Sequence, residues 1–240
     1  MLRKTIHLYP TLRCNTKCSY CSNIIPVAQQ GVYAYQEKSP GHWIKLLGQL
    51  NEQDIYITGG EIFLFNGVTD ILESIPNWAI IYTSGMMITE KLLGNTDPNK
   101  VKFRCSYHFC SGPIERFVEN IELLKSKDIL FQIFMVDVVE ENVLKLRAEY
   151  FRDKGFELGI DYDQRRHVHK KGTVKCSLHT AIVSPEGTVF HCVSKMIRHK
   201  DPGNNLFEGG EIADLKPVIC DEPGNCSPCD LAASYQKVIE

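Results

Sequence analysis

The stretch VKFRCSYHFCSGPIERFVENIELLKSKDILFQIFMVDV, residues 101–138, decides the fold class. It begins with a β-branched and aromatic run, continues with a segment of helical period that starts at Pro113, and returns to a second apolar run over residues 129–138. The helical segment places five apolar side chains on one stripe: Ile114, Phe117, Val118, Ile121 and Leu124. A strand, a helix and a strand in this order predict two parallel strands joined by a right-handed crossover.

The same rhythm extends in both directions through residues 1–161. The strands predicted are residues 5–9, 54–58, 79–83, 101–107, 129–138 and 156–160. Two further helices are predicted, with stripes formed by Trp43, Leu46, Leu47 and Leu50 after Ser39-Pro40 and by Val143, Leu146 and Tyr150 before Gly155. Alternating units of this kind predict an α/β fold, either an open sheet or a complete or partial barrel. Functional residues are then expected at the carboxyl ends of the strands.

Composition restricts the function classes. The chain has 240 residues and a formal net charge of −2, a balance that leaves nucleic-acid binding unsupported. No signal peptide and no apolar run of about 18 residues is found, so we expect a soluble, cytoplasmic protein without a membrane segment. Thiols stay reduced in that compartment, so the ten cysteines are expected to bind metal or do chemistry rather than form disulfides.

The rhythm stops after residue 161, which predicts a second region at residues 162–240. This third of the chain holds five of the ten cysteines. One hairpin is legible, with strands at 180–184 and 188–192 around Pro185-Glu186-Gly187. From Asp201 onward the chain is too poor in apolar periodicity to build its own core. We therefore expect a small cysteine-rich extension that a metal group holds in place.

The first cysteine cluster is CNTKCSYC, residues 14–21, directly after the first predicted strand. A structural zinc site normally closes with four ligands, and no fourth Cys or nearby His follows. Three thiolates suit a 4Fe-4S cluster, in which the fourth iron stays open for an exogenous ligand. The alternative is a structural zinc knuckle or a set of buried thiols.

These residues resemble the radical S-adenosylmethionine (radical SAM) enzymes, whose signature is CxxxCxxC with an aromatic residue before the last Cys. The residues that carry the resemblance are Cys14, Cys18, Tyr20 and Cys21 after the first strand, Gly59, Gly60 and Glu61 after the second, Thr83, Ser84 and Gly85 after the third, and Ser106 in the fourth. Ile62 departs from the pattern, because the family usually has Pro after the Glu.

The resemblance implies a partial (β/α)6 TIM-like barrel over residues 1–161. It assigns the cluster to Cys14, Cys18 and Cys21, and S-adenosylmethionine binding to Tyr20, Gly59, Gly60, Glu61, Ser84 and Ser106. Among these, the Gly-Gly-Glu motif holds the methionyl amino group, and Ser106 corresponds to a residue that contacts the ribose. The implied reaction is reductive cleavage of S-adenosylmethionine, which yields a 5'-deoxyadenosyl radical that abstracts hydrogen from a substrate C–H bond.

The second cysteine set resembles the twitch form of the SPASM-like extension of this family, which binds one auxiliary 4Fe-4S cluster. The ligands implied are Cys176, Cys192, Cys226 and Cys229. The longer form, with two auxiliary clusters, needs about seven cysteines, and this region has five. Cys220 is left over and is able to replace one of the four. The alternative is a zinc site with four cysteine ligands.

His108 is the leading catalytic candidate. Alternation along 101–108 separates an apolar face from a polar face, and the helices demand the apolar one. The polar face, formed by Lys102, Arg104, Ser106 and His108, should therefore point into the barrel, with His108 nearest its mouth. A structural histidine is the alternative. Cys105 is expected to be a small core residue.

Two other features near the mouth of the predicted barrel suggest further functions. Cys110 is a candidate hydrogen-atom donor, as in some radical peptide epimerases. Arg165 and Arg166 open a basic run past the sixth strand, which is either a solvated linker or a binding site for a carboxylate or phosphate.

An auxiliary cluster that accepts an electron favours an oxidoreductase acting on a small molecule. The barrel begins about four residues from Met1, which leaves no room at that end for a leader-binding domain and weighs against the alternative, a maturase or epimerase of ribosomally made peptides. An electron donor such as flavodoxin or ferredoxin is the expected partner. A non-enzymatic iron–sulfur or zinc protein is the alternative of another class, and Gly59-Gly60-Glu61 disfavours it.

Overall fold

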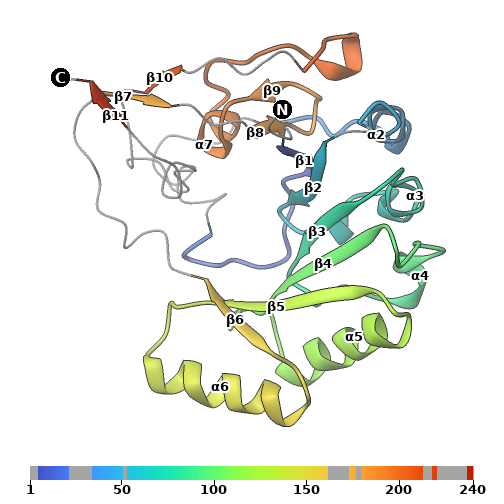
Figure 1. The fold of residues 1–240 in the computed structure, drawn as a ribbon, viewed down its shortest axis with the longest axis vertical. Helices are drawn as coiled ribbons and strands as arrows, with labels where there is room; N and C mark the ends of the chain where they lie inside the picture. Colours follow the sequence, from blue (N-terminus) through green and yellow to red (C-terminus); the bar gives the residue numbers. More distant parts are fainter. Residues whose placement is uncertain are drawn as a thin grey trace.

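The computed structural model describes residues 5–21, 34–50, 53–161, 173–176, 180–212, 218–220 and 237–239. Its main body is an eight-stranded sheet in the order β6-β5-β4-β3-β2-β1-β8-β9 (Figure 1). The strands are β1 (Thr5–Thr11), β2 (Asp54–Gly59), β3 (Ala79–Thr83), β4 (Val101–Ser106), β5 (Leu130–Val136), β6 (Leu158–Asp161), β8 (Thr180–Val183) and β9 (Val189–Phe190). All neighbours from β6 to β8 are parallel, and β9 is antiparallel to β8.

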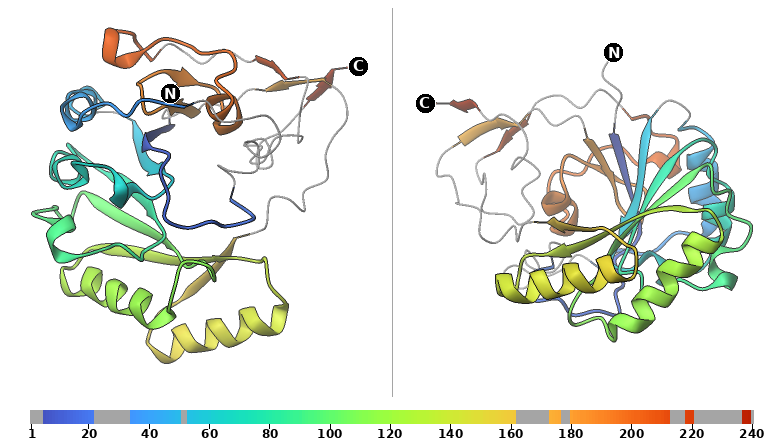
Figure 2. Two further views of the ribbon diagram at one scale, coloured as in Figure 1. Left: turned by 180° about the vertical axis from the view of Figure 1, so that it is seen from behind. Right: turned by 60° about the horizontal axis from the view of Figure 1, so that its bottom comes forward.

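Over strands β2 to β6, the described helices all cover one face of this curved sheet and leave the other face, called the open face below, uncovered by helices (Figures 1 and 2). They are α2 (Pro40–Leu47), η1 (Ile62–Leu64), α3 (Val68–Glu73), α4 (Glu90–Leu93), α5 (Ile114–Ser126) and α6 (Glu141–Asp153). This is the predicted α/β partial barrel, and the six predicted strands of residues 1–161 are all present.

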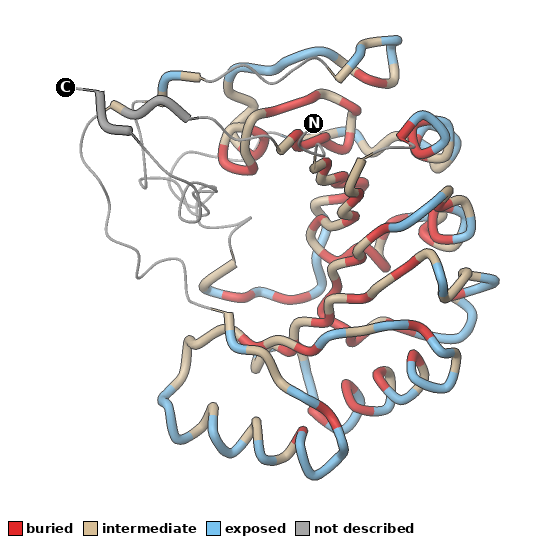
Figure 3. Tube along the Cα trace, viewed as in Figure 1, coloured by how far each residue is buried: buried red, intermediate tan, exposed pale blue. Residues whose placement is uncertain are grey.

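Buried side chains lie mainly between the sheet and its helices (Figure 3). The whole predicted stripe of α5 is buried, as are Trp43, Leu46 and Leu47 of α2. The stripe predicted for α6 is wrong at Leu146, which is 64% exposed, whereas Phe151 is fully buried. The helix is rotated so that Leu144 and Phe151, rather than Leu146, face the sheet. Both sets of residues are apolar at helical spacing, so only the packing against the sheet determines which set is buried.

The predicted hairpin is present, but it joins the main sheet. Its turn closes where Gly187, at φ +88°, donates its N–H to the Ser184 carbonyl at 2.9 Å. Strand β8 then pairs in parallel with β1, from Thr5 opposite Thr180 to Leu8 opposite Val183.

A second core cluster holds the hairpin, β1 and the short helix α7 (Val193–Ile197) together. Its members are Tyr9, Ile182, Phe190, Val193, Met196 and Ile197. A small sheet of β7 (Thr173–Cys176), β10 (Val218–Cys220) and β11 (Lys237–Ile239) has the order β10-β7-β11. The division of the chain at residue 161 stays a prediction, although residues beyond it extend the main sheet.

No helix in the described part of the chain is both long and apolar enough to cross a membrane.

Candidate active site

The turn that ends β2 packs directly against the chain that follows β1. Gly60 donates its N–H to the Thr11 carbonyl at 3.1 Å, and Glu61 donates its N–H to the Arg13 carbonyl at 2.8 Å. A Cβ atom at Gly60 would lie 2.2 Å from the Arg13 carbonyl oxygen, and one at Gly59 would lie 2.2 Å from that of Thr11. Only glycine fits at these two positions, which hold the start of the cysteine-bearing loop in place.

Glu61 is a buried carboxylate whose partners come from the end of β3. One oxygen accepts the Thr83 hydroxyl at 2.7 Å and the Phe63 N–H at 3.2 Å. The other accepts the Ser84 N–H at 2.8 Å and the Ser84 hydroxyl at 2.5 Å. Four donors satisfy this fully buried group, so the side chain joins the ends of β2 and β3. Glu61 and Ser84 are both predicted to contact the cofactor, and in the structure their side chains hydrogen-bond to each other.

An ion pair that sequence reasoning missed clamps the same loop from its exposed side. Arg13 donates from Nε and Nη2 to the two carboxylate oxygens of Glu37, each at 2.8 Å, and from Nη2 to the Leu64 carbonyl at 2.7 Å. The Thr11 hydroxyl also donates to Glu37. These contacts link the loop after β1 to η1.

The three cysteines of the first cluster lie in different surroundings. Cys14 is exposed, Cys21 is partly buried, and Cys18 is only 7% exposed. The Cys18 Sγ lies 3.3 Å from the Sγ of Cys110, in the loop after β4. Burial, followed by the hydrogen bond to Cys110, raises the pKa of the Cys18 thiol well above its ordinary value. Among the described residues, no group of three or more Cys, His, Asp or Glu side chains is arranged to bind a metal ion.

Tyr20 and His108 form a second bridge between the same two loops. The Tyr20 hydroxyl and the His108 Nδ1 are 3.0 Å apart, within hydrogen-bonding distance. Burial lowers the pKa of His108 to about 4, so the ring is neutral near pH 7. Burial also raises the pKa of the Tyr20 hydroxyl, and the nearby charge of Cys18 adds to the effect. The structure thus places Tyr20, Cys18, Cys110 and His108 together at the carboxyl ends of β1 and β4.

The alternation predicted along β4 is confirmed. Its apolar face is buried, with Val101, Phe103 and Cys105 at 0% exposure and Tyr107 at 4%. Its polar face is partly exposed and consists of Lys102, Arg104, Ser106 and His108. Cys105 is therefore a core residue, as expected.

The open face of the sheet carries an ion pair that the sequence did not reveal. Arg104 donates from Nη2 to both carboxylate oxygens of Asp161, the last residue of β6, at 2.7 and 2.8 Å. The Arg104 guanidinium also lies 3.7 Å from the Phe134 ring centroid and 5.5 Å from that of Tyr82. Arg104 was expected to point inward. Its partner Asp161 lies on β6, two strands away, so no pattern within β4 predicts the ion pair.

Aromatic rings continue this face toward β1. His7 stacks on Tyr56 with ring centroids 4.7 Å apart, and Tyr56 lies 6.1 Å from Tyr82. Burial lowers the pKa of His7 to about 4, so this ring is also neutral near pH 7. The open face therefore carries neutral rings beside the Arg104–Asp161 ion pair.

Part of the second cysteine set lies within the described residues. Cys176 ends β7 opposite Val218, and Cys220 ends β10 opposite Val174. The Sγ of Cys192 accepts the Lys195 N–H at 3.4 Å at the start of α7. Burial lowers the pKa of Lys195, but the hydrogen bond to Asp201 and the charges of Asp201, Cys192 and Cys220 outweigh it and raise that pKa. Cys192 and Cys220 therefore both lie near one ammonium group.

Several predicted residues fall outside the described part of the chain. They are Cys226, Cys229, Arg165 and Arg166.

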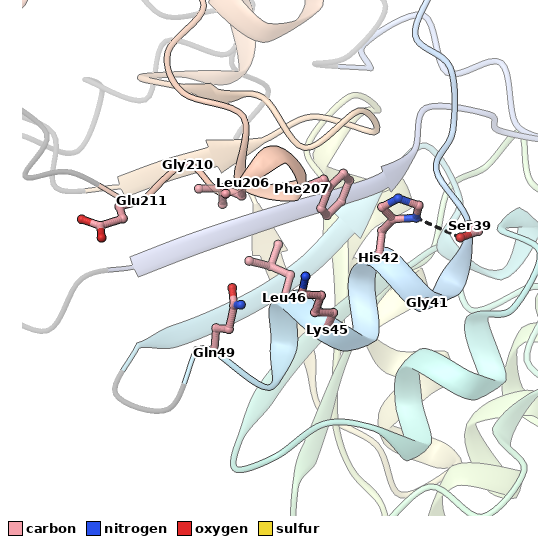
Figure 4. A pocket seen from close by; sticks show the side chains of 11 residues that line it. Ser39, Gly41, His42, Lys45, Leu46, Gln49, Leu206, Phe207, Gly210 and Glu211 are labelled. Carbon is pink, nitrogen blue, oxygen red and sulfur yellow. Dashed lines mark hydrogen bonds between the residues drawn. The ribbon is translucent and has the colours of Figure 1, made fainter.

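A pocket of about 650 Å³ lies between α2 on one side and η3 (Leu206–Glu208) with the residues that follow it on the other (Figure 4). Side chains from both segments line it, including Lys45, Phe207 and Glu211. The Ser39 hydroxyl and the His42 Nδ1, 2.9 Å apart, form a hydrogen bond at one end. None of the predicted site residues lines this pocket.

Comparison with known proteins places the fold. No protein-family model and no curated protein matches the chain. Among solved structures, native anSMEcpe with bound AdoMet superimposes with a TM-score of 0.64 at 15% identity, covering 88% of this chain and 80% of that one. The chain shares the fold of anSMEcpe. The same protein with bound AdoMet and Kp18Cys peptide superimposes with a TM-score of 0.61 at 15% identity, over 88% and 79% of the two chains.

The fold is shared with an AdoMet-bound protein, and the donor set of the loop after β1 fits an iron–sulfur cluster. Cys14, Cys18 and Cys21 lie within eight residues at the carboxyl end of a central parallel strand. The turn of Gly59 and Gly60 holds the start of this loop. Because Cys18 contacts Cys110, binding a cluster requires the loop to bring the three thiols together.

Proposed function

We propose that the protein is a radical SAM enzyme. The observation that carries this proposal is the position of the three-cysteine loop, which follows β1 and packs on the Gly59-Gly60 turn in a fold shared with an AdoMet-bound protein. A 4Fe-4S cluster held by Cys14, Cys18 and Cys21 would supply the electron that cleaves AdoMet to a 5'-deoxyadenosyl radical, which then takes hydrogen from a substrate C–H bond.

The chain's own residues have separate tasks in this proposal. Gly59, Gly60 and Glu61 shape the turn against which AdoMet binds, and Ser84 supports it through Glu61. Ser106 lies at the end of β4 on the open face, where we assign it to the ribose. His108, neutral and held by Tyr20, is the candidate for substrate contact or proton transfer.

The second cysteine set is assigned to one auxiliary 4Fe-4S cluster. Its proposed ligands are Cys176, Cys192, Cys226 and Cys229. Cys220 is a candidate replacement for one of them, because it shares the surroundings of Lys195 with Cys192. A cluster there would accept an electron from the substrate radical, which makes the enzyme an oxidoreductase. The first electron must come from outside, from a donor such as flavodoxin or ferredoxin.

Two substrate classes follow from this chemistry. A small molecule is the first, because an oxidation assisted by an auxiliary cluster suits it. A peptide is the second, and it is supported by the similarity to anSMEcpe with bound AdoMet and Kp18Cys peptide. Turnover assays with both classes, read out as 5'-deoxyadenosine coupled to product, discriminate between them.

The test is metal content combined with AdoMet cleavage. Anaerobically reconstituted protein should hold about eight iron and eight sulfide, from two four-iron clusters. Replacing Cys14, Cys18 and Cys21 together with Ala should remove about half of the iron and abolish 5'-deoxyadenosine formation. Cys105→Ala, which removes a core thiol outside the loop, is the matched control and should retain both.

Two results would contradict these assignments. Full AdoMet cleavage by the triple variant would exclude the first cluster from the loop after β1. Stoichiometric zinc with about four iron would make the second set a zinc site and remove the electron acceptor.

A further inference from the structure

Two thiols from distant parts of the chain meet at the candidate site. Cys18 follows β1 and Cys110 follows β4, and their sulfur atoms are 3.3 Å apart. The cysteines are 92 residues apart in sequence, so this contact depends on the fold. Cys18 is buried and Cys110 is exposed.

Both loops are held in place around this contact. The Tyr20–His108 hydrogen bond joins them a second time, two residues from each thiol. Within the loop after β4, Ser111 donates its N–H to the His108 carbonyl at 2.9 Å and its hydroxyl to the same oxygen at 2.6 Å. Within the loop after β1, Cys21 donates its N–H to the Cys18 carbonyl at 3.1 Å. The pairing of the thiols therefore belongs to an ordered contact between two loops.

We propose that Cys18 and Cys110 form a reversible disulfide in the cluster-free protein and that this bond withdraws Cys18 from the cluster ligands. The inference rests on the proposed function, because it takes Cys18 to be a ligand. A disulfide needs the two sulfur atoms about 2.05 Å apart, so they must come closer than the observed 3.3 Å.

The reaction needs an oxidant, which we take to be a low-molecular-weight disulfide such as oxidised glutathione. The exposed Cys110 thiolate attacks one sulfur of the oxidant, a mixed disulfide forms, and one small thiol leaves. The Cys18 thiol then gives up its proton as its sulfur attacks the Cys110 sulfur, and the second small molecule leaves as a thiol. In total, two protein thiols lose their protons and two electrons, and one oxidant molecule is reduced to two thiols.

The consequence is a protected but inactive form. Cys18 in a disulfide cannot bind iron, because only the thiolate is a ligand. The same bond shields Cys18 from oxidation to sulfinic acid, which is irreversible for most proteins. Reduction returns both thiols, and cluster assembly resumes.

The experiment uses the full-length, cluster-free chain and oxidised glutathione. After treatment, free-thiol counting and peptide mass mapping should show the Cys18–Cys110 disulfide. Subsequent anaerobic iron and sulfide loading without a thiol reductant should yield about four fewer iron atoms per chain than loading of the reduced protein. Dithiothreitol should restore the difference.

Two variants make the test specific. Cys110→Ser should lack the disulfide at Cys18 and should keep its iron uptake after oxidant treatment. Cys105→Ala, at a thiol that is fully buried, should behave like the unchanged protein. Mapping of the oxidised bond to Cys14–Cys18 or Cys18–Cys21 would overturn the proposal, and so would undiminished iron uptake by protein that carries the Cys18–Cys110 bond.

Failure of the proposed function has a different signature. In that case, reduced protein would take up no iron at Cys14, Cys18 and Cys21 and would not cleave AdoMet, whichever thiols the oxidant joins. Iron loading of the reduced sample therefore separates the two outcomes.

Discussion

His108 shows how the surroundings of one residue determine its chemistry. Its ring is mostly buried, its Nδ1 bonds to the Tyr20 hydroxyl, and its pKa is lowered to about 4. A neutral imidazole near pH 7 is able to accept a proton without first losing one. The sequence placed His108 on the inward face of its strand, and the structure adds Tyr20 as the group that orients it.

Replacing His108 with Gln tests its role. The change retains approximate size and hydrogen-bonding capacity but removes proton transfer. We expect unchanged iron content and uncoupled AdoMet cleavage, with substrate turnover reduced about a hundredfold or more. If His108 is purely structural, the variant should instead lose about 1–3 kcal/mol of folding stability, while its activity per folded molecule stays constant. Melting temperature and 5'-deoxyadenosine, measured on one preparation, distinguish these results.

His7 makes the stability of the fold depend on pH. Its folded pKa of about 4 lies below the ordinary value of 6.5, because burial disfavours the charged ring. Between these two pH values the unfolded chain binds more protons than the folded one. The free energy of unfolding should therefore be fully retained above pH 6.5 and should fall as the pH drops toward 4, by at most about 1.4 kcal/mol per pH unit for this residue.

Urea unfolding of the unchanged protein and of His7→Gln across this range measures the effect. Each data set is normalised to its own value at about pH 8, so that any loss of packing on Tyr56 cancels. The variant should show a shallower slope. Equal slopes would contradict a buried, neutral His7 on the open face.

Between elements, the closest approach is that of the β2 turn to the chain after β1. Two backbone hydrogen bonds hold these segments together, and they leave no room for a side chain at Gly59 or Gly60. Local propensity explains neither glycine, because the atoms that they avoid belong to Thr11 and Arg13. These contacts therefore fix the start of the cysteine-bearing loop relative to β2.

Gly60→Ala should disturb this contact. The new Cβ would lie 2.2 Å from a backbone oxygen, so a segment must move, at a cost of about 2 kcal/mol or more in stability. Iron uptake by the cysteine loop should fall with it. Gly41→Ala is the control, because its Cβ would meet no atom closer than 4.0 Å within α2, and helix propensity should add about 0.5–1 kcal/mol. Unchanged melting and iron uptake in Gly60→Ala would contradict the observed packing.

Over the whole molecule, the hairpin beyond residue 161 completes the edge of the main sheet. Strand β8 covers the edge of β1 that β2 leaves free, and the second core cluster buries Phe190 against the helix that follows. This arrangement predicts that the barrel and the hairpin unfold together. Strands β8 and β9, which lie within the predicted region at residues 162–240, therefore belong to the main sheet.

Phe190→Ala tests this cooperativity. Phe190 is 1% exposed, so its truncation should cost about 3–5 kcal/mol and lower the melting temperature of the entire main sheet in one calorimetric transition. Ile219→Ala, at a side chain 59% exposed on β10, should have a much smaller effect. A separate low-temperature transition, with the remainder unchanged, would show that the hairpin folds on its own.

The sequence by itself determined the elements of residues 1–161 and their order. Strand and helix periods predicted six strands within two or three residues at each end, the buried stripe of α5, and the two faces of β4. These features are local, because burial of one face repeats every two or 3.6 residues along the chain. The motif after β1 and the Gly-Gly-Glu turn were visible because their residues are contiguous in the sequence.

Only the tertiary structure decided which distant groups meet. It placed β8 beside β1, Cys18 beside Cys110, and Arg104 against Asp161, and it turned Leu146 toward solvent. None of these outcomes has a periodic signal, because apolar spacing specifies that a face or an edge is covered without specifying what covers it. The partners are set by how the parallel strands align across the sheet, which is a property of the assembled fold.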